Sequence, residues 1–141
     1  MGYGQGIGFK MKIWLNGKFV KEEEAKVDIT SAGFLYGQGV FETMRAYNER
    51  VFRLDSHLER LFKALPTLNL ELTVEPEVLK KALKQALKEN NLKDAYLRIT
   101  VWQGKDKAEA AVFARDYNFL NKEDYRKGFK AIVSSFRQNE F

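Results

Sequence analysis

A change of hydrophobic period within residues 41–65 constrains the fold of this chain more than any other feature. Residues 41–47, FETMRAY, alternate with period two, which predicts a strand with two different faces. Asn48-Glu49 follows as a hairpin turn would, and from Leu54 onward the apolar residues recur at helical spacing. This stretch therefore predicts a strand hairpin followed by an amphipathic helix, with Asp55 or Ser56 as its cap.

Length and composition favour one folded domain. The chain has 141 residues, of which 45% are hydrophobic and 30% charged, enough for one sizeable core. It lacks cysteine, which excludes disulfide scaffolds, thiolate zinc sites and cysteine nucleophiles, and favours the cytoplasm. His57 is the only histidine and no acidic cluster stands out, so we expect no metal site.

The net charge of +5 raises the question of nucleic acid or membrane binding. Much of the excess belongs to lysines of one predicted amphipathic helix: Lys80, Lys81, Lys84, Lys88 and Lys93. No aromatic residues interleave with them to stack on bases, so a solvated helix face is expected rather than a nucleic-acid surface. No apolar run approaches the ~20 residues of a membrane helix, and the N-terminus lacks the apolar segment of a signal peptide.

The remaining segments predict an α+β fold with a mostly antiparallel sheet and two main helices. Asn16-Gly17 is the strongest turn signal and predicts a hairpin over residues 12–20. Residues 27–29 alternate as a short strand, and residues 33–39 are expected to form a loop. Pro76 opens the second helix. Four further elements are strands at 96–102, 110–117 and 129–136 and a short helix at 121–127.

Three parts of the chain are expected from this pattern. Residues 1–11 are glycine-rich and predicted to be a flexible leader. Residues 12–120 form the α+β domain, and residues 121–141 an interdomain connection with the first strand of a truncated second domain. Within the strand at 96–102, Tyr96 and Arg98 share one face with Thr100 and Trp102, as the floor of a polar pocket would.

Five motifs in order resemble the N-terminal half of the fold type IV pyridoxal phosphate enzymes, the class IV aminotransferase family. They are WLNGKFV, YGQGVFE, HLERL, AYLRIT and AIVSSF, and together they run from about Lys12 to the end of the chain. The family includes branched-chain aminotransferases, D-amino acid aminotransferases and aminodeoxychorismate lyases. The motifs look most like those of the branched-chain members, although Ile99 replaces a proline that often follows the matching arginine there.

The resemblance implies pyridoxal 5'-phosphate as cofactor, with amino acids and 2-oxo acids as substrates. It implies that Arg60 holds the cofactor phosphate, for which a planar guanidinium is well suited. Four residues match positions that line the substrate pocket: Tyr36, Phe41, Tyr96 and Arg98. Arg98 and the two tyrosines would fix the substrate carboxylate, and Phe41 would contact its side chain. By the strand alternation Glu42 points away from Phe41, so we expect Glu42 and His57 to be structural.

One family feature is missing. The cofactor's Schiff-base lysine lies shortly beyond the strand that matches residues 129–136, and no lysine here has that pattern. We therefore expect a truncated, inactive chain without catalytic residues of its own, inclined to form homo-oligomers through exposed apolar surface. Aminodeoxychorismate lyase and D-amino acid aminotransferase remain alternatives within the family, and a non-catalytic binding or assembly domain remains an alternative of another class.

Overall fold

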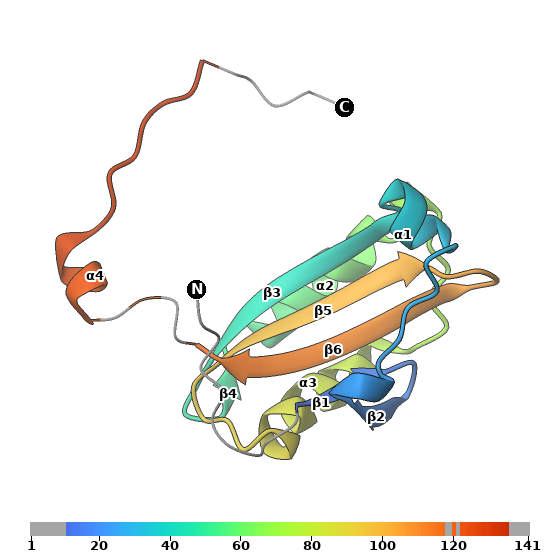
Figure 1. The fold of residues 1–141 in the computed structure, drawn as a ribbon, viewed down its shortest axis with the longest axis horizontal. Coiled ribbons are helices and arrows are strands. Elements are labelled where there is room, and N and C mark those ends of the chain that lie inside the picture. Colours follow the sequence, from blue (N-terminus) through green and yellow to red (C-terminus); the bar gives the residue numbers. More distant parts are fainter. Residues whose placement is uncertain (1–10, 118–119, 121, 136–141) are drawn as a thin grey trace.

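Six strands form one antiparallel sheet in the order β2-β1-β6-β5-β3-β4 (Figure 1). The computed structural model describes residues 11–117, 120 and 122–135. Its strands are β1 (Lys12–Leu15), β2 (Lys18–Lys21), β3 (Gly39–Tyr47), β4 (Arg50–Val51), β5 (Ala95–Gln103) and β6 (Ala108–Asp116). Its helices are α1 (Ala32–Tyr36), α2 (Leu54–Ala64), α3 (Pro76–Glu89) and α4 (Lys122–Lys127), with short 3₁₀ turns η1 (Glu22–Glu24) and η2 (Pro66–Leu68). The predicted α+β class with two main helices is confirmed.

Both predicted hairpins form. Asn16 and Gly17 have φ of 48° and 103°, and Asn48 and Glu49 have φ of 48° and 64°. Positive φ at both central residues matches the right-handed twist of the strands that the turn joins. The first hairpin joins β1 to β2, and the second leaves β4 paired only with Ala46 and Tyr47 of β3.

The helices α2 and α3 cover one face of the sheet and lie behind it in Figure 1. Their apolar stripes meet the alternate residues of β3, β5 and β6 that point toward them. The side chains with almost no exposed surface in this layer include Leu61, Leu79, Leu83, Leu87, Leu97, Ile99, Val101 and Val112. The core thus lies between the helices and one face of the sheet, and among the described residues the other face carries no helix.

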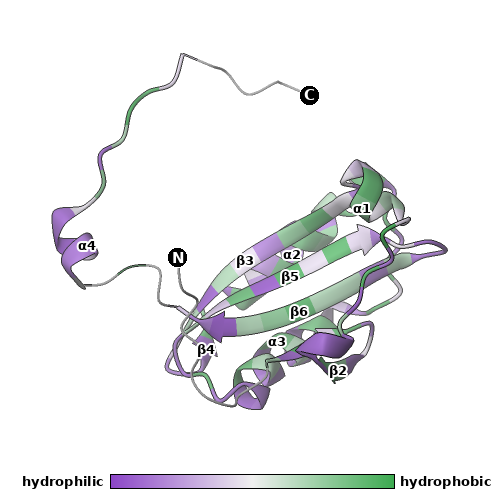
Figure 2. Ribbon diagram, in the orientation of Figure 1, coloured by the Kyte–Doolittle hydropathy of each residue, from purple (hydrophilic) through white to green (hydrophobic). Residues whose placement is uncertain are grey.

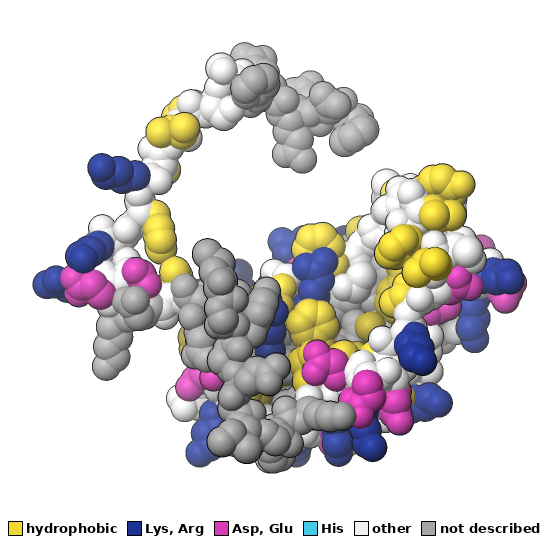
Figure 3. Space-filling view, viewed as in Figure 1, with side chains coloured by type: hydrophobic (Ala, Val, Ile, Leu, Met, Phe, Trp, Pro, Cys, Tyr) yellow, Lys and Arg dark blue, Asp and Glu magenta, His cyan; other side chains and the backbone are white. Residues whose placement is uncertain are grey.

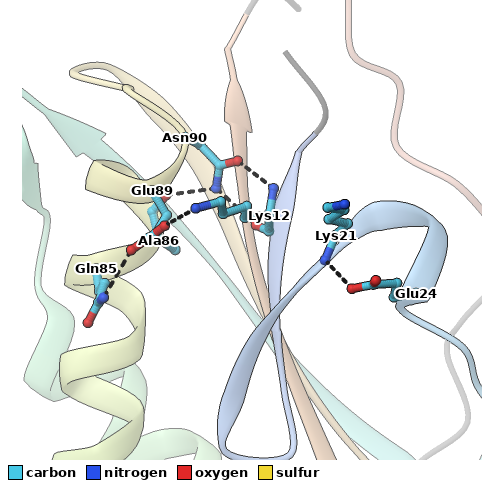
Figure 4. A network of polar contacts seen from close by, with 7 residues as sticks. All are labelled: Lys12, Lys21, Glu24, Gln85, Ala86, Glu89 and Asn90. Atoms are coloured by element: carbon cyan, nitrogen blue, oxygen red, sulfur yellow. Dashed lines mark hydrogen bonds and ion pairs between the residues drawn. The ribbon is translucent and has the colours of Figure 1, made fainter. Parts of the chain in front are cut away.

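Asn90 joins the end of α3 to the first strand. Its side chain accepts from the backbone nitrogen of Lys12 at 2.8 Å and donates to the carbonyl of Lys12 at 3.0 Å and of Ala86 at 2.8 Å (Figure 4). The ammonium of Lys12 also contacts Glu89 at 2.7 Å. These bonds satisfy a helix-end carbonyl and fix β1 beside α3.

Several local predictions are wrong. Residues 27–29 form no strand, because the carboxylate of Asp28 instead accepts from the backbone and hydroxyl of Thr30 as in a turn. The loop expected at 33–39 contains helix α1, capped by Ser31. Helix α2 begins directly after Arg53, whose φ is 49°, so Asp55 and Ser56 lie inside it and do not cap it.

The strand expected at 129–136 is also wrong over its described part. Residues 129–135 have no regular structure and run away from the sheet in Figure 1, because no described strand lies beside them to complete a ladder. Ile132 and Val133 are accordingly 93% and 101% exposed. The leader expected at 1–11 lies, except for Met11, outside the described residues, as does Phe136.

Candidate functional site

The open face of the sheet is the face opposite to α2 and α3. It gathers aromatic and arginine side chains from β3, β5 and β6, where Lys or Arg and hydrophobic side chains lie next to one another in Figure 3. The same strands carry strongly polar residues between apolar ones along their length in Figure 2. Charged and aromatic groups on a sheet surface without a helix cover are typical of a binding surface rather than of a core.

Phe41 and Arg98 meet on this face, as two of the predicted substrate residues. The Cζ atom of Arg98 lies 3.8 Å from the ring centroid of Phe41, a cation–π distance. Arg98 Nε also donates to the hydroxyl of Thr100 at 3.2 Å, and Thr100 is the register partner of Phe41. The guanidinium is therefore held on two sides by its own sheet, with Phe41 left 56% exposed beside it.

Tyr96 lies on the same face, two residues along β5 from Arg98. Its ring centroid is 6.3 Å from that of Phe113, and the Cζ of Arg115 lies 5.0 Å from the Tyr96 ring. Residues two apart on a strand project from one face about 7 Å apart, so Tyr96 and Arg98 can contact one ligand together. Tyr96, Arg98 and Phe41 are thus brought together as predicted from the alternation.

The sequence analysis assigned no role to two further arginines of the open face. Arg45 lies over Tyr117 with its Cζ 3.1 Å from the ring centroid, and its Nε is buried without a hydrogen-bond partner among the described residues. Arg115 lies over Tyr96. The signal that could have found them is parity: Arg45 is four residues from Phe41 and therefore shares its face.

Tyr36 takes a different position. It ends helix α1, at one end of the sheet, and is 81% exposed. Gly37 follows with φ of 67° as the left-handed cap of this helix. Gly39 has no positive φ; a Cβ there would lie 2.9 Å from the carbonyl oxygen of Val101, so its predicted close approach is to strand β5.

Arg60, the predicted phosphate residue, belongs to α2 and reaches Glu42 on the helix side of β3. Its Nε donates to one carboxylate oxygen of Glu42 at 2.5 Å and its Nη2 to the other at 2.6 Å. His57 Nδ1 lies 2.9 Å from the second oxygen. The Glu42 side chain is 7% exposed and that of Arg60 is 71% exposed, so the carboxylate is buried beneath an arginine that faces solvent.

The ion pair shifts both groups in the expected directions. The hydrogen bonds from Arg60 lower the pKa of Glu42, against the effect of burial, with a smaller contribution from His57. The same bonds to Glu42 raise the pKa of Arg60. Glu42 is therefore a carboxylate at neutral pH. Its predicted direction away from Phe41 is confirmed, but its pairing with Arg60 was not foreseen.

The outer edge of β3 connects the two groups. β4 pairs with β3 only at Ala46 and Tyr47, so among the described strands residues 39–44 have a neighbour on the β5 side alone. In Figure 1 this part of β3 forms a margin of the sheet, with α2 behind it. Phe41 and Glu42 point to opposite faces at that margin. A ligand bound there can contact Phe41 on one side and Arg60 on the other.

The described residues hold no group of three His, Cys, Asp or Glu side chains suited to a metal ion. None of their helices is both long and apolar enough to span a bilayer. The chemistry that this surface offers is recognition of anions: Arg60, Arg98, Arg45 and Arg115 present guanidinium groups, which bind carboxylate and phosphate by paired hydrogen bonds.

Curated relatives support an aminotransferase origin. A putative branched-chain-amino-acid aminotransferase of Methanocaldococcus jannaschii is 45% identical over 94 residues, 67% of this chain and 33% of that protein. A probable branched-chain-amino-acid aminotransferase of Rickettsia conorii is 36% identical over 132 residues, 89% of this chain and 46% of that protein. A D-alanine aminotransferase of Staphylococcus epidermidis is 34% identical over 93 residues, 66% of this chain and 33% of that protein. The chain thus spans between a third and a half of their length, and it matches their N-terminal portion.

Solved structures agree in fold. The branched-chain amino acid aminotransferase from Escherichia coli superposes with a TM-score of 0.80 at 26% identity, covering 93% of this chain and 46% of that one. The branched-chain aminotransferase from the archaeon Thermoproteus uzoniensis, solved with norvaline, has a TM-score of 0.72 at 36% identity, covering 78% and 42%. The family model for amino-transferase class IV matches residues 39–141, from the margin strand β3 to the end of the sequence. With that match over most of its length, the chain belongs to the class IV aminotransferase family.

Proposed function

We propose that this chain is the N-terminal part of a pyridoxal phosphate-dependent aminotransferase that acts on branched-chain or similar amino acids. The observation that carries the proposal is the margin of β3, where Arg60 lies on one side and Phe41 with Arg98 on the other. The cofactor-binding relatives support it: one solved relative carries a phosphopyridoxyl glutamate, another pyridoxamine 5'-phosphate and a third 4-methylvaleric acid.

Arg60 fits a cofactor phosphate. Glu42 occupies one edge of its guanidinium, while the side chain is 71% exposed and leaves the opposite edge open. In this proposal Arg60 holds the phosphate, and the bound ring accepts the electron pair released when the α-proton of an amino acid is removed. The lysine that carries the cofactor would come from outside these 141 residues, since none of the lysines here matches the family pattern.

Arg98 and Phe41 divide substrate recognition between them. Arg98 binds the substrate carboxylate through the N–H groups that Thr100 does not occupy, and Tyr96 and Tyr36 donate hydroxyls to it. Phe41, 56% exposed beside the guanidinium, contacts an apolar substrate side chain. Such a pairing suits an amino acid with one charged and one branched aliphatic end.

Borohydride reduction tests the cofactor part of the proposal. The full-length protein and the 141-residue chain are each mixed with pyridoxal phosphate, reduced and weighed by intact mass spectrometry. We expect one stoichiometric adduct on the full-length protein and none on the chain alone. A specific single-lysine adduct on the chain would refute the assignment of the lysine to another segment, and no adduct on either would favour a non-catalytic binding or assembly domain.

A substrate panel tests the specificity part. We expect the full-length protein to transaminate leucine, isoleucine or valine, and Arg98→Gln to raise KM for these acids far more than Lys105→Gln, a change in the exposed β5–β6 turn. The panel includes D-alanine, because a D-alanine aminotransferase is among the relatives at 34% identity. Preference for D-alanine, or release of pyruvate from aminodeoxychorismate, would replace the branched-chain assignment by the corresponding family alternative.

We also propose that the protein works as a homo-oligomer in the cytoplasm. The open face and the exposed Phe41 and Tyr36 offer apolar surface that a second subunit or domain would cover. Light scattering coupled to size exclusion would measure the mass of the full-length protein, and a monomer across the micromolar range would contradict the proposal.

A further inference from the structure

The buried carboxylate of Glu42 is the centre of a three-residue cluster that the substrate and phosphate roles leave unexplained. It accepts two hydrogen bonds from Arg60, at 2.5 and 2.6 Å, and lies 2.9 Å from His57 Nδ1. Glu42 comes from β3, while His57 and Arg60 lie three residues apart on α2. Two residues of one helix face thus converge on one carboxylate of the neighbouring strand.

The geometry of a guanidinium determines what this contact leaves free. The group has five N–H donors in one plane, and Glu42 takes Nε–H and one N–H of Nη2 along a single edge. Nη1 and the other N–H of Nη2 remain on the outer edge, in the paired arrangement that binds two oxygens of a phosphate. A carboxylate held on the inner edge therefore fixes both the plane and the direction of the outer one.

We infer that Glu42 is a positioning residue, which aims the free edge of Arg60 at an anionic phosphate group, and that His57 steadies the Glu42 carboxylate from its other side. The inference deepens the proposed function, on which it rests: it states how the phosphate anchor is oriented. Arg60 by itself has a long, mobile side chain, and rotamer freedom lost before binding need not be lost during it.

The opposite electrostatic effect makes the inference testable. A carboxylate beside an arginine reduces the positive potential that an arriving phosphate meets. If charge dominated, removing the carboxylate would tighten phosphate binding; if orientation dominates, removing it weakens binding. Glu42→Gln removes the charge while keeping the size of a side chain that is 7% exposed, so the sign of the affinity change separates the two effects.

The affinity of pyridoxal phosphate for the full-length protein is the first measurement. We expect Glu42→Gln to weaken binding about tenfold, the low end of the loss seen when the partner of a ligand-holding side chain is removed at metal sites. Arg60→Gln should weaken it at least as much, and the double variant no more than Arg60→Gln alone, because the two residues act as one unit. Glu59→Gln is the matched control, since Glu59 lies next to Arg60 but pairs with Lys63 at 2.7 Å.

The second measurement needs no cofactor. In the 141-residue chain, the Nε–H proton of Arg60 should give an NMR signal protected from exchange with water, which Glu42→Gln abolishes and Glu59→Gln preserves. Its absence from the unmodified chain would overturn the inference, as would a Glu42→Gln protein that binds the cofactor as tightly as the wild type or more tightly while Arg60→Gln binds weakly. Full affinity in Arg60→Gln would instead refute the phosphate role of Arg60, and with it the proposed anchor.

Discussion

Replacing Gly33 by alanine should detach helix α1 from the sheet. A Cβ on Gly33 would lie 2.7 Å from Trp102 Cβ, 2.8 Å from its Cδ1 and 3.0 Å from the carbonyl oxygen of Gln103. Carbon atoms in contact are normally about 3.5 Å or more apart, so the helix must retreat by about 0.8 Å. Trp102 cannot yield easily, because its Cβ is fixed by strand β5 and the residue is 7% exposed.

Two terms set the size of the effect. Overpacking of this kind destabilises by about 1–3 kcal/mol. Alanine is better than glycine within a helix by up to about 1 kcal/mol, which offsets part of the loss. The free energy of unfolding should therefore fall by about 1–2 kcal/mol, which corresponds to a urea midpoint lower by roughly 0.5–1 M for typical slopes.

Urea unfolding of the 141-residue chain, followed by far-UV circular dichroism, measures this change. Gly37→Ala is the matched control: no atom lies within 4 Å of its Cβ, but its φ of 67° makes alanine strained by about 1–2 kcal/mol. NMR shifts separate the two variants, because only Gly33→Ala should move the Trp102 indole resonances strongly. A Gly33→Ala chain as stable as the wild type, with an unmoved indole, would refute the packing of α1 on β5.

Three further changes test other parts of the structure. Leu83→Ala empties a fully buried site of α3 and should lower the unfolding free energy by about 2–5 kcal/mol in urea, while exposed Lys84→Ala next to it should change it by less than about 0.5. The lowered pKa of Glu42 means that its stabilisation is present above its ordinary value of 4.5 and is lost as the pH falls through the folded value, so the stability gap between wild type and Glu42→Gln should shrink on acidification below 4.5; a constant gap would contradict the ion pair. Gly17→Ala forces alanine to a φ of 103°, so hydrogen exchange of the β1–β2 amides should speed up, and unchanged exchange would contradict the turn geometry.

Elements whose signals are local could be predicted from the sequence. The turns at Asn16 and Asn48 carry residues that tolerate positive φ, and the alternation in β3 and β5 places Phe41, Tyr96 and Arg98 on one face. The strand expected at 27–29 failed because three alternating residues do not specify a partner. Its only polar residue satisfies a turn instead, which is a contact of two residues' range.

Partners that are distant in the chain could not be predicted. The alternation indicated that Glu42 points to the core face, but not that Arg60, eighteen positions later, would cover it. That contact depends on how far α2 is displaced along β3, which the turn at Arg53 sets through its positive φ. The capping-box spacing at Ser56 suggested a different start, and propensity alone cannot decide between two plausible first turns.

The register of β3 against β5 determines which side of the margin each site residue occupies. Gly39 pairs with Trp102, and its missing Cβ lets the strand pass close to the carbonyl of Val101, where a Cβ would lie at 2.9 Å. A slip by one residue would place a Cβ at that point, turn Phe41 into the core and expose Glu42 on the open face. Burying Phe41 while exposing a carboxylate near Arg98 would remove the apolar contact and neutralise the guanidinium together. The glycine of the YGQG loop therefore contributes to the site by fixing the strand rather than by touching a ligand.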